Sequence, residues 1–353
     1  MEKIDDLPRP FGAMNRRSFI KLSGLLGLGI TSTGLIPATA EAVKFNKKMY
    51  KVSKTRLAMG TFVSMTLIHP SRDRAEEALG WAFEEIDRLT GLMNRFDETT
   101  AMAQLNRDGY LNDVPSEIIH VVARALYHNR LSRGTFDITI KPLVDLFKEK
   151  FGGKQKVTPN AKEIKQAIKL VDSNKIELKE RSICFKKHGM GITLDGIAKG
   201  YIVDRASEVL VEHEIKNHLI NAGGDIRTMG VRADKKPWTV AIQDPLKRKN
   251  YPDIIHMRNG AIATSGNYEI YFDREKMFHH IVDPGTGLSP SLSASVSVMT
   301  TKAIEADALS TSVFVMNPLK GKRFINALPH SECLVIDRYG NLLKSKGWEN
   351  AAI

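Results

Sequence analysis

The chain has 353 residues, of which 42% are hydrophobic and 26% are charged, an ordinary composition for a globular protein with a sizeable core. Its formal net charge is +12, but the sequence has no helix-turn-helix, no zinc-finger spacing and no basic run interleaved with aromatic residues. We therefore exclude nucleic acid as a partner and expect the positive charge to attract an anionic substrate.

Residues 1–40 have the pattern of an export signal. Arg16 and Arg17 precede an apolar stretch that runs from Leu22 to Ile36, and small residues follow it up to Ala40. The stretch has about 15 residues, fewer than the roughly 20 that a transmembrane helix needs. We interpret residues 1–40 as a twin-arginine signal peptide, with a short anchoring helix as the alternative. No cysteine stands near the cleavage site, so we expect a soluble periplasmic protein without a lipid anchor.

The next segments are predicted in chain order from their periodicity and end signals. Residues 41–55 are predicted to be a polar linker, and residues 56–353 a single catalytic domain. The pattern predicts a strand over 56–69 with a break at Met59-Gly60, and an amphipathic helix over 72–93. Further helices are expected over 116–133, where Gly134 ends the helix, and from Asn160 to about Val171.

Beyond residue 175 the pattern changes to short strands. We predict helices at 196–213 and 302–315, and strands at 175–178, 182–186, 191–194, 217–221, 226–230, 238–243, 261–264, 268–272, 278–282, 295–299, 332–337 and 341–344. Strands and helices mixed in this order indicate an α+β or mixed α/β fold. Cys184 and Cys333 each stand in an apolar, strand-like run, so we expect two buried free thiols.

Asp307 and Thr311 form a candidate metal site. They are four residues apart in a run with helical periodicity, so both side-chain oxygens should leave the same face of the helix. A hard divalent cation prefers such oxygens, and Mg²⁺ often takes only one or two protein ligands beside substrate phosphates. The small apolar residues around Asp307 strengthen the prediction, because a carboxylate in such surroundings needs a partner.

Three further motifs fit the chemistry of a phosphate-bearing substrate. His280 stands at the end of a predicted strand and could transfer a proton, although a lone histidine is more often structural. Gly196 and Lys199 lie where a strand is predicted to enter a helix, a position that favours an anion. The paired glycines of 221–225 and the motif at 264–267 are turns first and ligand loops second, and Asp137 would ordinarily cap backbone N–H groups.

Taken in order, these motifs resemble those of the FAD:protein FMN transferase family, also called the ApbE family. The matching blocks lie at 59–61, 94–106, 134–139, 196–204, 221–225, 264–268, 280–284 and 307–311. The resemblance implies an ApbE-like fold, with strands flanked by helices and two lobes around a flavin-nucleotide cleft. It also implies Mg²⁺-dependent transfer of FMN from FAD to a Thr or Ser hydroxyl of an acceptor protein, with release of AMP.

The resemblance further implies an acceptor with an Asp-x-x-Thr/Ser motif, in a membrane redox complex or an extracytoplasmic flavin domain. It assigns the proton-accepting base to His280. It assigns Mg²⁺ to Asp307, Thr311 and the backbone carbonyl of Gly196. The implied FAD contacts are Met59, Phe96, Thr135, Phe136, Asp137, Thr193, Asp195, Lys199 and Val282.

The sequence departs from the family pattern at three positions. Thr193 stands where many relatives have an aspartate, which Asp195 would replace, and Phe96 stands in place of a frequent tyrosine. Gly285 occupies a position that often holds arginine. These differences affect individual flavin and adenine contacts and leave the implied metal site unchanged.

Two alternative functions remain open at the level of the sequence. A Mg²⁺-dependent FAD pyrophosphatase would use the same site and give FMN and AMP to water. A non-catalytic exported FAD-binding protein would need the pocket but would not need His280, Asp307 and Thr311.

Overall fold

The computed structural model describes residues 41–46, 49–152, 157–246, 248, 251–267 and 279–350. They all belong to one compact unit that spans residues 38–353. The predicted export signal lies outside the described residues. In the part of the chain that is described, no helix combines the length and the apolar character needed to cross a membrane.

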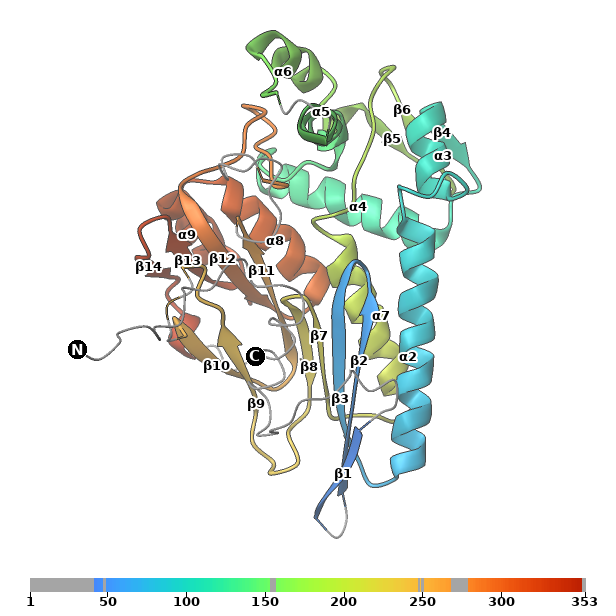
Figure 1. The fold of residues 1–353 in the computed structure, drawn as a ribbon, viewed down its shortest axis with the longest axis vertical. Helices are drawn as coiled ribbons and strands as arrows, with labels where there is room; N and C mark the ends of the chain where they lie inside the picture. Colours follow the sequence, from blue (N-terminus) through green and yellow to red (C-terminus); the bar gives the residue numbers. More distant parts are fainter. Residues whose placement is uncertain are drawn as a thin grey trace, which may run out of the picture. The chain divides into compact units, whose positions relative to one another are not determined.

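A nine-stranded antiparallel sheet runs through this unit (Figure 1). Its strand order is β1-β2-β3-β7-β8-β11-β12-β13-β14. The strands are β1 (Glu41–Asn46), β2 (Met49–Ala58), β3 (Thr61–His69), β7 (His218–Ala222), β8 (Asp225–Met229), β11 (Gly260–Gly266), β12 (Ser293–Thr300), β13 (Glu332–Asp337) and β14 (Leu342–Lys344). Every residue of β12 is buried, so this part of the sheet is covered on both faces.

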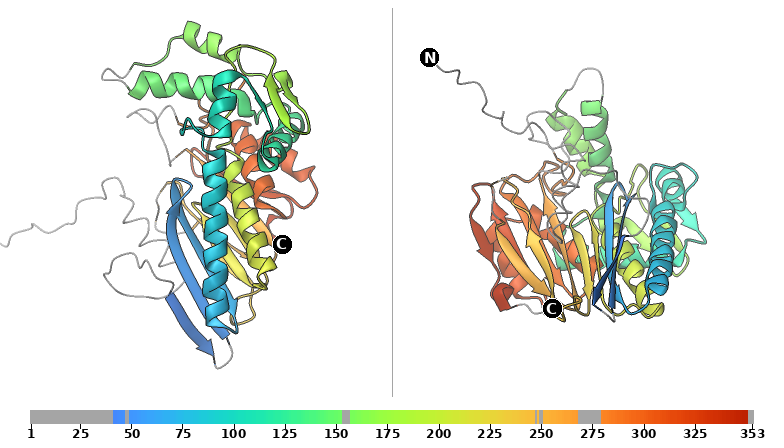
Figure 2. Two further views of the ribbon diagram at one scale, coloured as in Figure 1. Left: turned by 90° about the vertical axis from the view of Figure 1, so that its right-hand side faces the viewer. Right: turned by 60° about the horizontal axis from the view of Figure 1, so that its bottom comes forward.

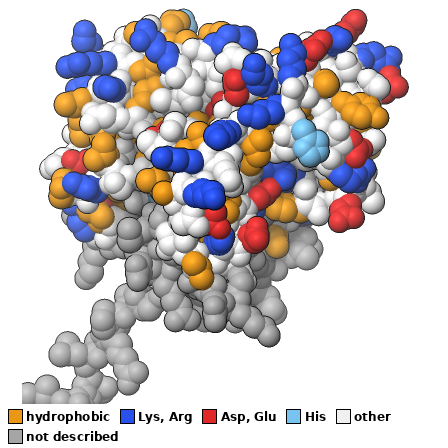
Figure 3. Space-filling view, turned by 90° about the horizontal axis from the view of Figure 1, so that it is seen from above, with side chains coloured by type: hydrophobic (Ala, Val, Ile, Leu, Met, Phe, Trp, Pro, Cys, Tyr) orange, Lys and Arg blue, Asp and Glu red, His pale blue; other side chains and the backbone are white. Residues whose placement is uncertain are grey.

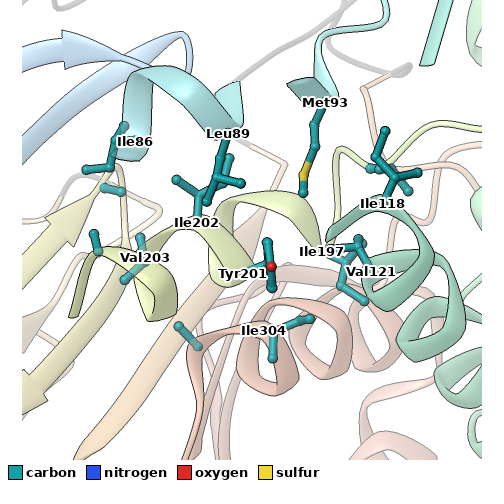
Figure 4. Close-up of a cluster of buried hydrophobic side chains, with 14 of the residues drawn as sticks. Ile86, Leu89, Met93, Ile118, Val121, Ile197, Tyr201, Ile202, Val203 and Ile304 are labelled. Atoms are coloured by element: carbon teal, nitrogen blue, oxygen red, sulfur yellow. The ribbon is translucent and has the colours of Figure 1, made fainter. Parts of the chain in front are cut away.

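Three helices pack against the sheet and against one another. They are α2 (Arg72–Met93), α7 (Ala198–Glu212) and α8 (Ala303–Val315), and Figures 1 and 2 show α2 and α7 side by side. Side chains of these helices and of α4 (Ser116–Leu131) form the core shown in Figure 4, including Leu89, Val121 and Ile202. This packing fixes α7 and α8, the two helices that carry most of the predicted metal and phosphate residues.

A smaller group of elements lies at the top of Figure 1. It contains α3 (Ala101–Asp108), α4, the short helix η1 (Ile138–Ile140), α5 (Lys141–Gly152) and α6 (Ala161–Ile168). A three-stranded sheet of β4 (Tyr110–Asn112), β6 (Ser182–Phe185) and β5 (Ile176–Leu178) completes it, with η2 (Ser173–Lys175) between α6 and β5. Elsewhere β9 (Trp238–Ile242) pairs with β10 (Asp253–Met257), and α9 (Pro318–Asn326) and η3 (Trp348–Asn350) belong to the C-terminal part.

The free backbone N–H groups at helix starts in this fold are hydrogen-bonded either by neighbouring side chains or by side chains distant in the sequence. Asn160 caps α6 in a reciprocal capping box with Glu163, as the predicted helix start at this residue requires. The first turn of α8 has no cap from its own N-terminal residue. Its free N–H groups at Ala303 and Ile304 instead donate to the two carboxylate oxygens of Asp204 on α7, each at 2.9 Å. A side chain of one site helix therefore fixes the start of the other.

Several predictions about the elements are confirmed and several are wrong. The mixed α+β class is confirmed. The linker predicted at 41–55 is wrong, because these residues form β1 and most of β2, which buries Val52 and pairs with β3 along its length. The break at Met59-Gly60 is a two-residue hairpin turn with φ of 51° and 71°, so 56–69 is two strands rather than one.

Three other expectations fail for identifiable physical reasons. Residues 191–194 form no strand, because the backbone of Ile192 is bound at both its N–H and its carbonyl by the side chain of Asn106. Thr264, Ser265 and Gly266 belong to β11 rather than to a turn. Cys184 is exposed on β6 because its neighbours take the buried alternate positions, whereas Cys333 is buried as expected. The strand predicted at 268–272 lies outside the described residues. The strand predicted at 278–282 is wrong, because residues 279–282 are described and, apart from an isolated bridge at His279, they form no strand.

Candidate active site

A pocket with about 750 Å³ of empty space, including its opening, gathers most of the predicted site residues. The contributing segments are the loop and η1 after α4, the loop that enters α7, the end of β11, residues 280–282, and α8. The predicted residues that line it are Thr135, Phe136, Asp137, Thr193, Asp195, Gly196, Lys199, His280, Val282, Asp307 and Thr311.

Asp307 is the most deeply buried acid of the pocket, with 4% of its surface exposed. Burial raises the pKa of its carboxyl well above the ordinary value, and repulsion from Asp225 raises it further. The Lys199 ammonium and the backbone N–H of Gly200, which donates to Asp307 Oδ2 at 3.1 Å, act in the opposite direction. A carboxylate in this position is stabilised by additional positive charge, which a bound cation would provide.

Gly200 is the residue that lets α8 approach α7 this closely. A Cβ atom on Gly200 would lie 2.6 Å from the carbonyl carbon of Ala303 and 2.8 Å from the Cα atom of Ile304. No side chain fits in that space, so glycine is required for the contact between the two helices. The same close approach brings the Gly200 N–H within reach of Asp307.

Lys199 is held at the pocket wall by a second buried acid. Its Nζ atom lies 2.8 Å from Oδ2 of Asp225, the last residue of the 221–225 motif and 2% exposed. Asp225 begins β8 after a turn whose Gly223 has φ of 65° and packs against Thr61, where a Cβ would come within 3.1 Å of the Thr61 Cβ. The glycine motif thus serves to place one carboxylate beside Lys199, a role that the sequence analysis did not assign.

The Thr311 side chain lies next to the backbone of Gly196 in the pocket. A Cβ atom on Gly196 would lie 3.1 Å from Thr311 Oγ1, so the main chain passes directly beside this hydroxyl. The Thr311 hydroxyl lies 3.3 Å from Oγ of Ser265, which also lines the pocket. The predicted spacing is confirmed in one respect, because Asp307 and Thr311 both project from α8 into the same pocket.

Asp137 lines the pocket, but its carboxylate is already used inside the protein. It accepts hydrogen bonds from the Thr139 N–H at 2.8 Å, the Ser173 hydroxyl at 2.7 Å and the Asn129 amide at 3.0 Å. It therefore caps η1 and ties the loop after α4 to η2, which is the structural alternative considered from the sequence. Its contribution to the pocket is to shape the wall that Thr135 and Phe136 present.

Met59 and Phe96 are the predicted residues that do not line the pocket. Met59 occupies the β2–β3 turn and packs against the main core. The Phe96 ring is 67% exposed and lies between two cations, with Arg95 Cζ 4.4 Å and Lys148 Nζ 4.5 Å from its centre. Arg95 connects this ring to the pocket, since its guanidinium lies 3.1 Å from the carboxylate of Asp195.

His280 lines the pocket next to a histidine of a different kind. His279 is 2% exposed, packs edge-on against Phe314, and its Nε2 atom lies 2.9 Å from the carbonyl of Pro290. His280 is half-buried, and it is the histidine that faces the space where a ligand would bind. Of the two adjacent histidines, only His280 therefore has the position of a proton acceptor.

Several pocket residues were not predicted as site residues. Ile138, Ile140, Val144 and Ile281 form an apolar wall, and Thr264, Ser265 and Gly266 contribute the end of β11. The family block at 264–268 contains the second group, but we expected a turn there and did not assign these residues to the site. The apolar wall carries no sequence signal, because these residues look like any others that fill a core.

The donors of the pocket fit a hard divalent cation. Asp307 offers a buried carboxylate, Thr311 a hydroxyl and Gly196 a neighbouring backbone carbonyl, and all of them are oxygen ligands. No group of three or more His, Cys, Asp or Glu side chains is placed to hold a metal within the described residues. A cation here would take few protein ligands, as Mg²⁺ does when phosphate oxygens complete its shell.

Comparison with known proteins agrees with this geometry. Residues 59–335 match the model of the ApbE family. The chain is 30% identical over 250 residues to a Haemophilus influenzae FAD:protein FMN transferase, covering 66% of this chain and 72% of that protein. It is 28% identical over 319 residues to one from Klebsiella pneumoniae, covering 86% and 88%.

Solved structures give the same result. The crystal structure of an ApbE protein from Thermotoga maritima is similar with a TM-score of 0.77 and 28% identity, covering 85% of this chain and 98% of that one. The flavin transferase ApbE of Vibrio cholerae has the same fold, with a TM-score of 0.73, 24% identity, and coverage of 88% and 99%.

Proposed function

The chain belongs to the ApbE family, and we propose that it is an FAD:protein FMN transferase that attaches FMN to a Thr or Ser hydroxyl of an acceptor protein and releases AMP. That it is an enzyme of flavin transfer follows from its relatives. One observation supports the finer proposal most directly. A single pocket contains a histidine, a buried carboxylate, a threonine hydroxyl and a lysine held by its own acid.

The proposed reaction replaces the phosphoanhydride bond of FAD with a phosphoester bond to the acceptor. The acceptor oxygen forms a bond to the phosphorus atom of the FMN half of FAD. The bond from that phosphorus to the bridging oxygen breaks, and its electron pair leaves with AMP. His280 takes the proton of the acceptor hydroxyl, a role that suits an imidazole near neutral pH. The products are a phosphodiester-linked FMN, AMP and one proton.

The residues of this chain bind and orient the substrate for that exchange. The Lys199 ammonium, fixed by Asp225, places positive charge at the wall where the pyrophosphate would lie. The apolar wall of Ile138, Ile140 and Val144 offers a surface for a flat ring system and excludes water. Mg²⁺ held by Asp307, Thr311 and the carbonyl of Gly196 would neutralise charge on the pyrophosphate oxygens when bound.

Two features outside the pocket enter the proposal. Figure 3 shows Lys and Arg side chains close together on the face seen from above, which would raise the rate of encounter with an anionic substrate. We further propose that residues 1–40 direct export through the twin-arginine machinery to the periplasm. The acceptor would then carry its Asp-x-x-Thr/Ser motif in a membrane redox complex or an extracytoplasmic flavin domain.

The test uses the purified chain from Glu41, FAD, Mg²⁺ and an acceptor domain that carries Asp-x-x-Thr. We expect the acceptor to gain the mass of one FMN less one water, together with one AMP per acceptor. The gain should require Mg²⁺ and disappear when the acceptor threonine is replaced by alanine. Free FMN and AMP with an unmodified acceptor would instead identify a pyrophosphatase, and intact bound FAD would identify a carrier.

Two variants test the assigned roles in the same assay. His280→Ala should slow transfer by about 100-fold or more, because general base catalysis contributes about that much, while FAD affinity stays near that of the wild type. Asp307→Ala should lose the dependence on Mg²⁺ together with activity. Undiminished transfer by either variant would remove the corresponding assignment. Ser297→Ala, which removes a buried hydroxyl that bonds Thr264 but does not itself line the pocket, serves as the control.

A further inference from the structure

Two serine hydroxyl groups connect the Thr311 side chain to the backbone of Asp307, and these are the two residues whose side chains are proposed above as metal ligands. Ser265 Oγ on β11 lies 3.3 Å from Thr311 Oγ1 and 2.9 Å from Ser310 Oγ. Ser310 Oγ in turn donates to the backbone carbonyl oxygen of Asp307 at 3.0 Å. The chain of hydrogen bonds therefore runs from one proposed ligand to the main chain of the other through a neighbouring strand.

The direction of every bond in this chain follows from counting protons. A hydroxyl group has one proton to donate and can accept through its lone pairs. Ser310 gives its proton to a carbonyl, which can only accept, so Ser265 must be the donor to Ser310. Ser265 then has no proton left, and Thr311 must be the donor to Ser265. The Thr311 O–H bond consequently points toward β11.

This orientation is the one that a metal ligand requires. A neutral hydroxyl binds a cation through a lone pair, so its proton must point away from the ion and find an acceptor elsewhere. We propose that Ser265 is a positioning residue that accepts the Thr311 proton and so turns the Thr311 lone pairs toward the cation site. The inference rests on the proposed function, since it concerns the Mg²⁺ site named there.

The surroundings of these hydroxyl groups favour a fixed arrangement of the hydrogen bonds over a fluctuating one. Ser310 is 1% exposed and Ser265 is half-buried, so water competes weakly for these groups and the bonds are stronger than in solvent. Ser265 is also held in place by its strand, because β11 pairs with β12 in a register that sets Ser265 opposite Val296. A ligand supported from a strand is more precisely placed than one supported from a loop.

The same helix supplies a comparison for Thr311. A helical Ser or Thr commonly donates to the carbonyl four residues earlier, as Ser312 does to the carbonyl of Ala308 at 2.7 Å. For Thr311 that carbonyl belongs to Asp307, which already receives the proton of Ser310. Ser310 and Ser265 thus divert the Thr311 hydroxyl from the usual helical bond to one that leaves its lone pairs in the pocket.

The experiment measures Mg²⁺ binding directly, by calorimetry and by the rise in melting temperature on adding MgCl₂, with the purified protein saturated with FAD, because phosphate oxygens are expected to complete the metal shell. The variants are Ser265→Ala, which removes the acceptor, Ser265→Thr, which keeps a hydroxyl, and Ser297→Ala. Ser297 is 1% exposed and bonds Thr264 at 2.8 Å, so it matches the loss of a buried strand hydroxyl away from Thr311. FAD affinity is measured for each by fluorescence.

We expect Ser265→Ala to weaken Mg²⁺ affinity about tenfold, while Ser265→Thr and Ser297→Ala stay within about twofold of the wild type. FAD affinity should be unchanged in Ser297→Ala, whose side chain does not line the pocket. Equal Mg²⁺ affinity of the wild type and Ser265→Ala would overturn the positioning role alone. Equal weakening by Ser297→Ala would also overturn it, as a general effect of lost hydroxyls. A wild-type protein that binds no Mg²⁺ would overturn the proposed metal site together with this inference, whether or not FMN transfer is observed.

Discussion

Replacing Gly200 by alanine should separate the two helices that build the site. The added Cβ would lie 2.6 Å from the Ala303 carbonyl carbon and 2.8 Å from the Ile304 Cα atom. Carbon atoms prefer separations of about 3.5–4.0 Å, so α7 and α8 must move apart by about 1 Å. Overpacking of this kind costs about 1–3 kcal/mol, whereas alanine gains about 1 kcal/mol over glycine in helix propensity. We expect a net loss of up to about 2 kcal/mol in the free energy of unfolding.

Gly80→Ala is the matched control for this substitution. Gly80 lies inside α2, and an added Cβ there would meet nothing within 4 Å. The same chemical change should therefore stabilise the protein by about 0.5–1 kcal/mol. Urea unfolding of the two variants, followed by circular dichroism, should place their midpoints on opposite sides of the wild type.

Function gives a second readout for Gly200→Ala. The Gly200 N–H donates to Asp307 Oδ2, so a shift between the helices also moves the proposed metal ligand. We expect FMN transfer to fall by at least tenfold and the Mg²⁺ requirement to rise, because misplacement by about 1 Å is costly in an active site. The packing argument would be refuted by a Gly200→Ala protein that is as stable as Gly80→Ala and transfers FMN at the wild-type rate.

Three further predictions concern buried titratable groups. Burial lowers the pKa of His218 to about 4 from an unfolded value near 6.5, so its contribution is present above pH 6.5 and is lost as the pH falls through 4. The stability of the wild type relative to His218→Gln, from urea unfolding at each pH, should drop by about 3 kcal/mol between pH 7 and pH 4; a constant difference would contradict the assignment. Burial raises the pKa of the Asp204 carboxyl to about 6, above its unfolded value, so its contribution to stability is present at low pH and is lost as the pH rises through 6. The free energy of unfolding of the wild type, relative to Asp204→Asn, should therefore fall by about 2–3 kcal/mol as the pH rises from 4 to 7. Asp225→Asn keeps the shape of the side chain but removes the negative charge that lies 2.8 Å from Lys199. The site becomes more positive, and Mg²⁺ affinity should weaken by about 1–2 kcal/mol, or roughly tenfold, in a calorimetric titration; tighter Mg²⁺ binding would argue against this electrostatic role.

Local patterns predicted the helices that carry the site with good accuracy. The helix expected over 196–213 is α7, Ala198–Glu212, and the helix expected over 302–315 begins one residue later, at Ala303. Periodicity and capping residues act within one or two turns, so they can be read from neighbouring positions. The spacing of Asp307 and Thr311 was sufficient for the same reason, since four residues along a helix bring two side chains to one face.

Short strands and turns were less predictable, because their conformation depends on partners elsewhere in the chain. Residues 41–55 read as a polar linker, yet they pair with one another and with β3 in the sheet. Residues 264–266 read as a turn, but pairing with β12 makes them a strand. In both places a distant strand supplies the hydrogen bonds that decide the conformation.

By itself the sequence determined the residue types of the site, the helices that bear them and the family to which the chain belongs. Tertiary structure alone decided how these residues support one another. Gly200 meets Asp307 across 107 positions of the chain, and Ser265 meets Thr311 across 46. The partner of Lys199 and the path of the Thr311 proton likewise depend on contacts between α7, α8, β8 and β11. Such contacts follow from how the sheet orders its strands and how closely two helices approach, and no local pattern encodes either.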